Sequence, residues 1–499
     1  MVGSMMRLAL LSLCAGCAFA AVELDPVFGD HMVVQQKKPL YVFGTTDDDD
    51  TPVTVRFNGK RATAVVTKGH WLAELPPMAA SARGHGLVVE QGGCKAGVED
   101  VLIGELWLAA GQSNMLFRVD ETENAAAIIP AAGNNLLRLH HGEPRPYLAD
   151  KPFPQSELKL LQEGRMFSGS WAVCSPDSVK RMSAVAYLFA NRLQQELKVP
   201  VGIVTAAVGG AEMICWTPPS VLKAEYMEVM DNSWPRSPFL TPWHRTCAEA
   251  NLGENVTNAH PFKPGYLYRT GIDPWLHMSL AGVIWYQGEA DAELQDAKQS
   301  KKLLTHLIEG WRKESTAPED PLPFIMVQLP RIKDTKEGLR AGWPEFRRLQ
   351  HQVAEKLPKV GCVCTIDLGS KDTNVHPRNK DAVAARLAAH ALSMVYGRRV
   401  PCRGPELRKA KADGETVELV FNYADGLQTT DGKAPAGFEL ADKSRQFEPA
   451  RAVINGKTIR LKADFVDEPV YVRYLWAPHA EPNLINRDKL PAMPFSRQL

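Results

Sequence analysis

The sequence predicts an α/β protein: a mostly parallel sheet covered by helices, with a β-rich region before it and another after it. From about Glu99 to Gly397, short apolar segments alternate with longer segments of helical periodicity, a pattern typical of a parallel sheet with crossover helices. On either side, short segments rich in Val, Thr and aromatic residues are separated by hairpin signals such as Asn58-Gly59 and Asn455-Gly456. The length of 499 residues is too great for one core, which agrees with several domains.

Strand and helix patterns alternate through the central region. The expected strands are apolar over almost their whole length, as in a sheet covered on both faces. The expected helices show apolar residues at spacings of three and four. Strands are expected at 101–110, 201–210, 280–291, 323–330 and 361–369, and helices at 183–198, 301–313, 343–357 and 379–397.

We expect a short leader and three domains. Residues 1–20 form the leader, 21–100 a small β-sandwich accessory domain, 101–400 the central α/β domain and 401–499 a second β-rich domain. Between 218 and 274 the periodicity gives way to Trp, Pro and Asn. We interpret that segment as an insertion over the substrate side of the sheet.

The N-terminus has the pattern of a secretory signal peptide. Arg7 precedes an apolar stretch that ends in the small-residue site Ala18-Phe19-Ala20. Cleavage after Ala20 would export the chain to the periplasm or the extracellular space. A lipid anchor at Cys17 is an alternative. We find no later segment long and apolar enough to span a membrane, so we expect a protein that is not membrane-spanning.

The charge balance gives no reason to expect a polyanionic partner. Lys and Arg number 58 against 57 Asp and Glu, and no long block of either sign occurs. We therefore expect neither nucleic acid nor an anionic membrane as partner. The acidic run at 47–50 lacks the spaced oxygen ligands of a calcium loop, and we interpret it as a solvated turn.

The cysteine pattern indicates no metal site and leaves disulfide pairing open. Seven cysteines remain after the expected cleavage, an odd and scattered set whose pairing the sequence does not determine. None of their spacings to each other or to histidine is typical of zinc ligands. These cysteines are Cys94, Cys174, Cys215, Cys247, Cys362, Cys364 and Cys402.

Candidate site residues lie where the expected strands end. Ser113 follows the first strand, the second ends at Gly209-Gly210, the third ends at Gln287-Gly288-Glu289, and His376 lies in the segment after the last. Each is an ordinary turn or cap residue when taken alone. In open α/β sheets, however, ligands bind beyond the carboxyl ends of the strands, where these residues would meet.

Together these residues supply the groups that acyl transfer requires. Ser113 would be the nucleophile and His376 the base that takes its proton. The backbone N–H groups of Ser113 and Gly209 and the side-chain amide of Gln287 would form the oxyanion hole. An acid or a carbonyl group must hold the other ring nitrogen of the imidazole, and Asp372 and Glu289 are nearby candidates in the sequence.

Ordered blocks of the sequence resemble the sialate O-acetylesterase family. The blocks lie between about Phe28 and Phe495 and include "GELWLAAGQSNM", "PVGIVTAAVGGAEMICW", "GVIWYQGEAD", "DLGSKDTNVHPRNK" and "VRYLWAPHAEPNLINRDKLPAMPF". The resemblance implies a flavodoxin-like SGNH hydrolase core between β-rich domains. It also implies a serine esterase, related to acetylxylan esterases, that removes acetyl groups from sugar hydroxyls without a metal or other cofactor.

The resemblance carries over residue by residue, with departures at the acid. Ser113 matches the nucleophile and His376 the base, while Gly209 and Gln287 match the blocks in which such enzymes place oxyanion donors. The position three residues before the histidine, where these hydrolases commonly have the acid, is Thr373.

The acid assignment therefore has alternatives. Close relatives often have Asp two residues before the histidine, and that position is Asn374 here. We assign the orienting acid to Asp372, four residues before His376, with Glu289 or a backbone carbonyl as alternatives. Leu116, Ala211 and Ile214 replace residues common in the family, so substrate contacts are expected to differ.

Three functions follow from these observations. The leading hypothesis is an exported esterase that removes O-acetyl groups from sialic acids. The second is the same chemistry on acetylated xylan or another polysaccharide, because loops rather than the fold select the sugar. The third is a catalytically silent glycan-binding protein. Oligomeric state does not follow from the sequence.

Overall fold

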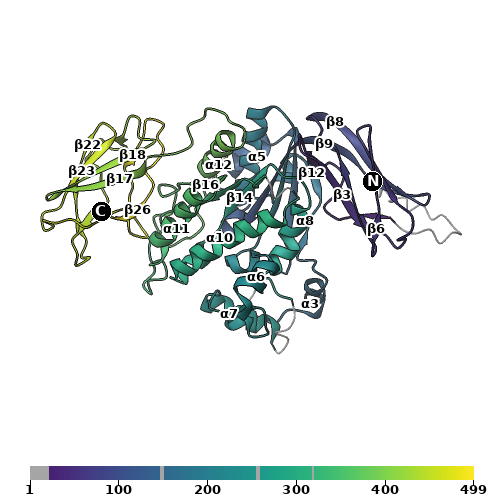
Figure 1. Ribbon diagram of the computed structural model, residues 1–499, viewed down its shortest axis with the longest axis horizontal. Coiled ribbons are helices and arrows are strands. Elements are labelled where there is room, and N and C mark those ends of the chain that lie inside the picture. The colour runs from purple at the N-terminus through teal and green to yellow at the C-terminus, as the bar shows by residue number, and fades with distance from the viewer. Residues whose placement is uncertain (1–21, 147–150, 254–258, 317–319) are drawn as a thin grey trace, which may run out of the picture.

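The protein is described here from a computed structural model, which describes residues 22–146, 151–253, 259–316 and 320–499. The leader expected at 1–20, with the alternative at Cys17, lies outside these residues. Three parts follow one another along the longest axis: N-terminal strands, a central α/β part and C-terminal strands (Figure 1). The architecture is α/β, with a large mixed sheet and further β-rich regions.

A twelve-stranded mixed sheet forms the centre of the molecule. Six neighbouring strands of it pair in parallel, in the order β10-β13-β9-β14-β15-β16. Other pairs in the sheet, such as those of β10 with β11 (Phe167–Ser168) and of β9 with β8 (Ser81–Gln91), are antiparallel. The six strands are β9 (Cys94–Gly111), β10 (Asn134–Pro144), β13 (Val201–Ala207), β14 (Gly282–Tyr286), β15 (Phe324–Val327) and β16 (Val360–Val363).

Helices cover both faces of these strands. Alternate residues of β9 point to opposite sides: Leu106 and Leu108 belong to one apolar core, Trp107 and Ala109 to the other. Helices α5 (Ala184–Leu197) and α12 (Asp381–Met394) pack together over one face, and α10 (Ala297–Glu314) and α11 (Trp343–Lys356) pack together on the other. These helices and the strands β13 to β16 confirm the alternation predicted from the sequence.

The N-terminal strands form two layers that share an apolar interior, including Val42, Trp71, Val55 and Val89. The predicted hairpin at Asn58-Gly59 is confirmed: both residues have positive φ, and Phe57 pairs with Lys60 across the turn. One layer comprises β1 (Glu23–Leu24), β3 (Leu40–Thr45), β6 (Val66–Thr67) and β7 (His70–Leu75), and the other includes β2 (Val33–Gln35), β4 (Val53–Phe57), β5 (Lys60–Ala64) and β8 (Ser81–Gln91).

Strand β9 belongs to both the N-terminal layers and the central sheet. Its first half pairs antiparallel with β8 as far as Ile103, and its second half pairs in parallel with β13 from Glu105 onward. The boundary expected between residues 100 and 101 therefore falls inside one continuous strand of 18 residues.

The C-terminal strands have a core of their own. The hairpin predicted at Asn455-Gly456 joins β22 and β23, where Asn455 pairs with Thr458. The strands of this region are β17 (Glu406–Asp413), β18 (Thr416–Asn422), β19 (Gln428–Thr429), β20 (Phe438–Ala441), β21 (Glu448–Pro449), β22 (Arg451–Asn455), β23 (Thr458–Lys462), β24 (Tyr471–Tyr474), β25 (Leu484–Ile485) and β26 (Phe495–Gln498).

Short helices occupy much of the segment 218–274. They include α6 (Pro219–Glu225), α7 (Pro242–Leu252) and α8 (Asp273–Leu276). Helices α6 and α7 lie with α3 (Gln155–Gln162) at one side of the α/β part (Figure 1). Helix α6 contacts α10, so this segment packs on the face of the sheet that α10 covers.

Over the described ranges, no helix has the length and apolar character needed to cross a bilayer. All seven cysteines within those ranges are free thiols.

Arg347 joins the C-terminal region to the α/β part. Its side chain lies on α11 and is fully buried. The guanidinium donates to the carbonyls of Leu329 and Pro330 after β15, and to those of Ala477 and Pro478 after β24, at 2.8–3.0 Å. Burial lowers the pKa of Arg347 to about 9, but the guanidinium stays charged at neutral pH.

We expect Arg347→Met to lower the free energy of unfolding by about 3 kcal/mol, because four carbonyls lose a charged donor. Thermal unfolding measures the loss, and limited proteolysis near Ala477 reports the loosened segment. The control is Arg348→Met, on the same helix, whose partner is the partly exposed Glu345 and which should cost under about 1 kcal/mol. Equal losses in the two variants would contradict this account of Arg347.

Candidate active site

Ser113 lies at the carboxyl end of β9, where the chain turns into the short helix α1 (Ser113–Leu116). The turn requires glycine at position 111. Gly111 has a φ of 141°, and a Cβ there would lie 2.1 Å from the carbonyl oxygen of Tyr286 in the neighbouring strand. The close approach of β9 and β14 thus fixes the point at which Ser113 leaves the sheet.

The imidazole of His376 contacts the hydroxyl of Ser113. Its Nε2 lies 2.8 Å from Oγ, although the two residues are 263 positions apart in the chain. His376 is partly buried in the segment between β16 and α12. The ring of Phe117 lies beside it, with centroids 6.3 Å apart. The structure therefore brings together the predicted nucleophile and the predicted base.

Asn114, the residue after the serine, links the segment of His376 to the core. Its buried side-chain amide donates to the carbonyl of Val375 at 2.8 Å and to Glu289 Oε1 at 2.5 Å. Its Oδ1 accepts from Lys380 Nζ at 2.5 Å. One side chain thus connects β9, the start of α9 (Glu289–Glu293) and the segment that carries the imidazole.

Glu289 and Lys380 form a buried pair of ionisable groups through Asn114. Burial raises the pKa of Glu289, whereas the hydrogen bond from Asn114 and the charge of Lys380 act to lower it. Burial lowers the pKa of Lys380 to about 7, although Glu289 and Glu121 oppose that shift. The Lys380 ammonium also lies 4.6 Å from the ring centroid of Phe117.

The surroundings of His376 favour its neutral form. Partial burial is the largest cause that lowers its pKa, and the positive charge of Lys380 acts in the same direction. The carboxylate of Glu121 has the opposite effect. The imidazole is therefore mostly uncharged at neutral pH and can accept a proton from Ser113.

The structure does not place Asp372 against the imidazole, which corrects the expectation that it orients His376. Its carboxylate is exposed and accepts from the backbone N–H of Asn374 at 2.9 Å. The side chain of Asn374 accepts in turn from the backbone N–H of His376 at 3.0 Å. Both residues shape the loop through successive Asx turns. The alternative acid, Glu289, contacts Asn114 and not the imidazole.

The predicted oxyanion donors differ in their positions. Gly209 lies beside the nucleophile, since a Cβ on Gly209 would be 3.9 Å from the Cβ of Ser113. Gln287 instead donates both amide hydrogens elsewhere, to the carbonyl of Ala211 at 2.7 Å and to Asp291 Oδ2 at 2.8 Å. In this arrangement the side chain of Gln287 holds the turn that contains Gly209 through the carbonyl of Ala211. It directs no amide N–H toward Ser113.

Several supporting residues escaped the sequence analysis. The side chain of Gln112 accepts from the backbone N–H groups of Gly288 and Ala290 at the start of α9, at 3.3 and 3.5 Å. Asp291 accepts from the backbone N–H of Met213 at 3.0 Å. Burial raises the pKa of Asp291 to about 7. The only available signal was the presence of amide and acid side chains next to strands that are otherwise apolar.

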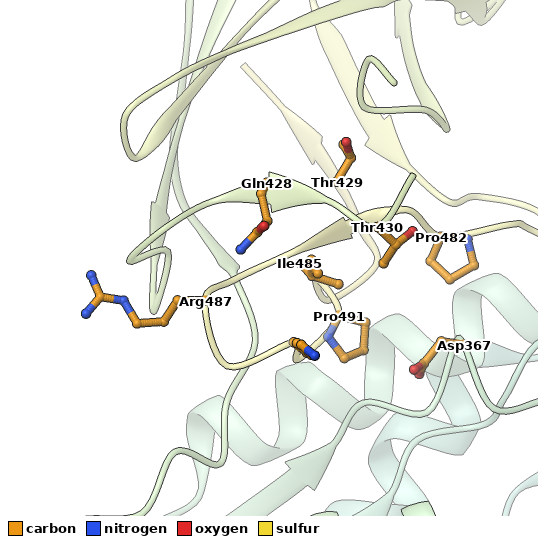
Figure 2. A pocket seen from close by; sticks show the side chains of 9 residues that line it. Asp367, Gln428, Thr429, Thr430, Pro482, Ile485, Arg487 and Pro491 are labelled. Carbon is orange, nitrogen blue, oxygen red and sulfur yellow. The ribbon is translucent and has the colours of Figure 1, made fainter. Parts of the chain in front are cut away.

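The described ranges contain no group of three or more His, Cys, Asp or Glu side chains suited to holding a metal ion. A cavity of about 370 Å³ lies in the C-terminal region, where β19 and β25 meet the segment around Asp367 (Figure 2). None of the residues that line this cavity is one of the predicted site residues.

Comparison with known proteins gives consistent likenesses. The sequence family described as "carbohydrate esterase, sialic acid-specific acetylesterase" matches residues 253–393. Sialate O-acetylesterases of Mus musculus and Homo sapiens are each 28% identical, over 414 and 489 residues. The matches cover 76% of this chain and 73% of the mouse protein, and 89% of this chain and 86% of the human one.

A solved structure is similar over nearly the whole chain. It is that of a novel carbohydrate acetylesterase from Xanthomonas citri, 30% identical, with a TM-score of 0.80, covering 96% of this chain and 99% of that one. With these likenesses, the α/β fold and the site at its sheet edge define an enzyme of the carboxylic ester hydrolase class. The chain belongs to the sialate O-acetylesterase family of carbohydrate esterases.

The lowered pKa of His376 leads to a pH test. As the base for Ser113, His376 would be active in its neutral form, so kcat/KM on an acetyl ester should rise as pH increases through a midpoint below the usual value of 6.5. Lys380→Met removes a charge that lowers this pKa. We therefore expect the acid limb to move to higher pH, so that the variant loses more of its activity at pH 6 than at pH 8.

The control for this test is Lys371→Met, an exposed lysine in the same segment. Its acid limb should match that of the unmodified protein. Because the midpoint is independent of the amount of folded enzyme, a loss of stability in Lys380→Met does not mimic the shift. An unchanged midpoint in Lys380→Met would contradict the electrostatic account of His376.

Proposed function

We propose that the protein removes O-acetyl groups from sialic acids by transferring the acetyl group first to Ser113 and then to water. The observation that carries this proposal is the 2.8 Å contact between His376 Nε2 and Ser113 Oγ at the carboxyl edge of the sheet. Family membership supplies the ester and sugar class, since the curated relatives are named sialate O-acetylesterases.

The proposed first step forms an acetyl-serine. His376 Nε2 takes the hydroxyl proton as Ser113 Oγ attacks the acetyl carbonyl carbon. The backbone N–H groups of Ser113 and Gly209 stabilise the oxyanion of the tetrahedral intermediate. The bond to the sugar oxygen then breaks, and the imidazolium returns its proton to that oxygen, which leaves as a free hydroxyl group.

The second step regenerates the serine. His376 takes a proton from a water molecule that attacks the acetyl-serine, and the intermediate then releases acetate while the proton returns to Ser113 Oγ. In this proposal Gln287 is a positioning residue for the Gly209 turn. The negative charge of Glu121 favours the imidazolium formed in each step, because it acts to raise the pKa of His376.

We further propose that the central part is a flavodoxin-like SGNH core. Counting all six parallel strands from β9, the order β10-β13-β9-β14-β15-β16 is 2-3-1-4-5-6. Without the outer strand β10, the remaining five strands stand in the order 2-1-3-4-5, which is the flavodoxin-like order. Ser113 follows β9 and Gln287 follows β14, at the point where the strand order reverses. The domains at 21–100, 101–400 and 401–499, and export by a cleaved leader, remain part of this proposal.

A second candidate substrate is an acetylated polysaccharide such as acetylxylan. The observation that favours it is the likeness to the Xanthomonas citri protein, which is described as a carbohydrate acetylesterase and is similar over nearly the whole chain. Acetate released from O-acetylated sialoglycoprotein and from acetylxylan under equal conditions distinguishes the two candidates. Faster release from acetylxylan would replace sialic acid by polysaccharide in the proposal while keeping its chemistry.

Removal of the proposed nucleophile tests the chemistry itself. We expect Ser113→Ala to lower kcat on p-nitrophenyl acetate by at least about 10³-fold, and His376→Ala to lower it similarly, because members of a catalytic unit fail together. The control is Asp372→Asn in the same loop, which should retain most activity because its carboxylate does not contact the imidazole. Unchanged rates in Ser113→Ala would overturn the proposal, and so would binding of acetylated glycan without turnover.

A further inference from the structure

We propose that Trp243 is the platform on which the pyranose ring of the acetylated sugar stacks while its acetyl group lies at Ser113. This inference rests on the proposed function, since it names the surface that recognises the sugar of that reaction. Trp243 lies in the first turn of α7, within the segment 218–274. Its side chain is among the exposed large apolar groups of the described chain, with 58% of its surface accessible.

The indole borders the turn that carries the proposed oxyanion donor. A Cβ placed on Gly210 would lie 3.4 Å from the Cζ3 atom of Trp243. Gly210 directly follows Gly209, which is beside Ser113. The exposed indole is therefore separated from the nucleophile by one two-glycine turn, and both glycines are partly open to solvent.

The ring is held in place from behind. The imidazole of His244 meets the indole edge to face, with centroids 4.6 Å apart, and Phe262 lies 6.4 Å away. His244 is itself buried and fixed: its Nδ1 lies 2.7 Å from Glu212 Oε1 and 2.5 Å from Thr241 Oγ1. Because the indole is already fixed, sugar binding would immobilise few further side chains. Little conformational entropy would be lost, which favours affinity.

Glycine at position 210 lets this arrangement form. A Cβ there would lie 2.5 Å from His244 Nε2, and the residue has a φ of 79°. His244 can thus pack against the backbone of the turn, which brings the start of α7 up to the two glycines. The same buried Glu212 accepts from the backbone N–H of Thr241 at 2.8 Å, so one carboxylate fixes both the start of α7 and His244.

The chemistry of an exposed indole suits a sugar ring. One face of a pyranose presents C–H groups with small positive partial charge, and the face of an indole is negative. Such a surface binds the ring while leaving its hydroxyl and ester groups accessible. Trp243 would act on sugar binding and not on the reacting atoms. Its loss should therefore affect esters of sugars and spare esters that have no sugar.

The test compares two acetyl esters in Trp243→Ala and Trp243→Phe. On O-acetylated sialic acid we expect kcat/KM of Trp243→Ala to fall about tenfold, mainly through KM, and Trp243→Phe to keep part of the activity. On vinyl acetate, whose leaving group has no ring, both variants should remain within about twofold of the unmodified protein. The control is Phe465→Ala, which removes an aromatic ring that is 84% exposed in the C-terminal region.

Binding of the same sugar to Ser113→Ala, with and without Trp243→Ala, gives a second readout that does not depend on turnover. We expect about tenfold weaker binding in the double variant, measured by calorimetry. Equal binding, or an equal loss of kcat/KM on both esters, would overturn the platform. Failure of the proposed function would give a different result, because the unmodified protein would then hydrolyse neither ester. Calorimetry would still show whether Trp243 binds the sugar.

Discussion

The hydrogen bonds of the Asn114 side chain hold the two halves of the site together. The hydroxyl of Ser113 belongs to the end of β9, whereas the imidazole of His376 belongs to a segment more than 260 residues away that has no regular secondary structure. Asn114 donates to that segment at Val375 and accepts from Lys380 at the start of α12. Two further bonds hold the same segment: Arg378 donates to the carbonyl of Glu121 at 3.1 Å, and Asn379 donates to the carboxylate of Glu123 at 2.7 Å.

This connection has an electrostatic consequence. Asn114 joins the buried acid Glu289 to the buried base Lys380, and taking both groups out of water shifts their pKa values in opposite directions. The residual positive charge of Lys380 then reaches His376 and helps to keep the imidazole neutral. The network of Asn114 and Lys380 that holds the segment of His376 therefore also lowers the pKa of the imidazole.

The sequence predicted the parts of the molecule that depend on local pattern. The hairpin turns at Asn58 and Asn455 follow from dipeptides with a strong turn preference, and the buried strands follow from apolar runs. Ser113, Gly209 and His376 could be placed near one another because the carboxyl ends of parallel strands lie along one edge of a sheet. These inferences need the order of the elements and not the positions of side chains.

Side-chain direction within loops could not be predicted in the same way. Asp372 is close to His376 in sequence, yet Asx turns direct its carboxylate to the backbone of Asn374. Gln287 follows β14, the strand paired with β9, yet its side-chain amide donates to Ala211 and Asp291. The spacing of residues along the chain did not indicate the hydrogen-bond partners of Asp372 or of Gln287. Lys380 was overlooked because a lysine before a helix usually lies in water, whereas this one is buried beneath the site.

The central claim is that His376 activates the hydroxyl of Ser113 as a nucleophile. Labelling with a fluorophosphonate, followed by peptide mapping with mass spectrometry, tests this most directly, because the reagent marks only a hydroxyl made nucleophilic by its surroundings. The account predicts a single adduct on Ser113 in the unmodified protein and almost none in His376→Ala. An adduct on a different residue, or equally rapid labelling of Ser113 after the imidazole has been removed, would contradict it.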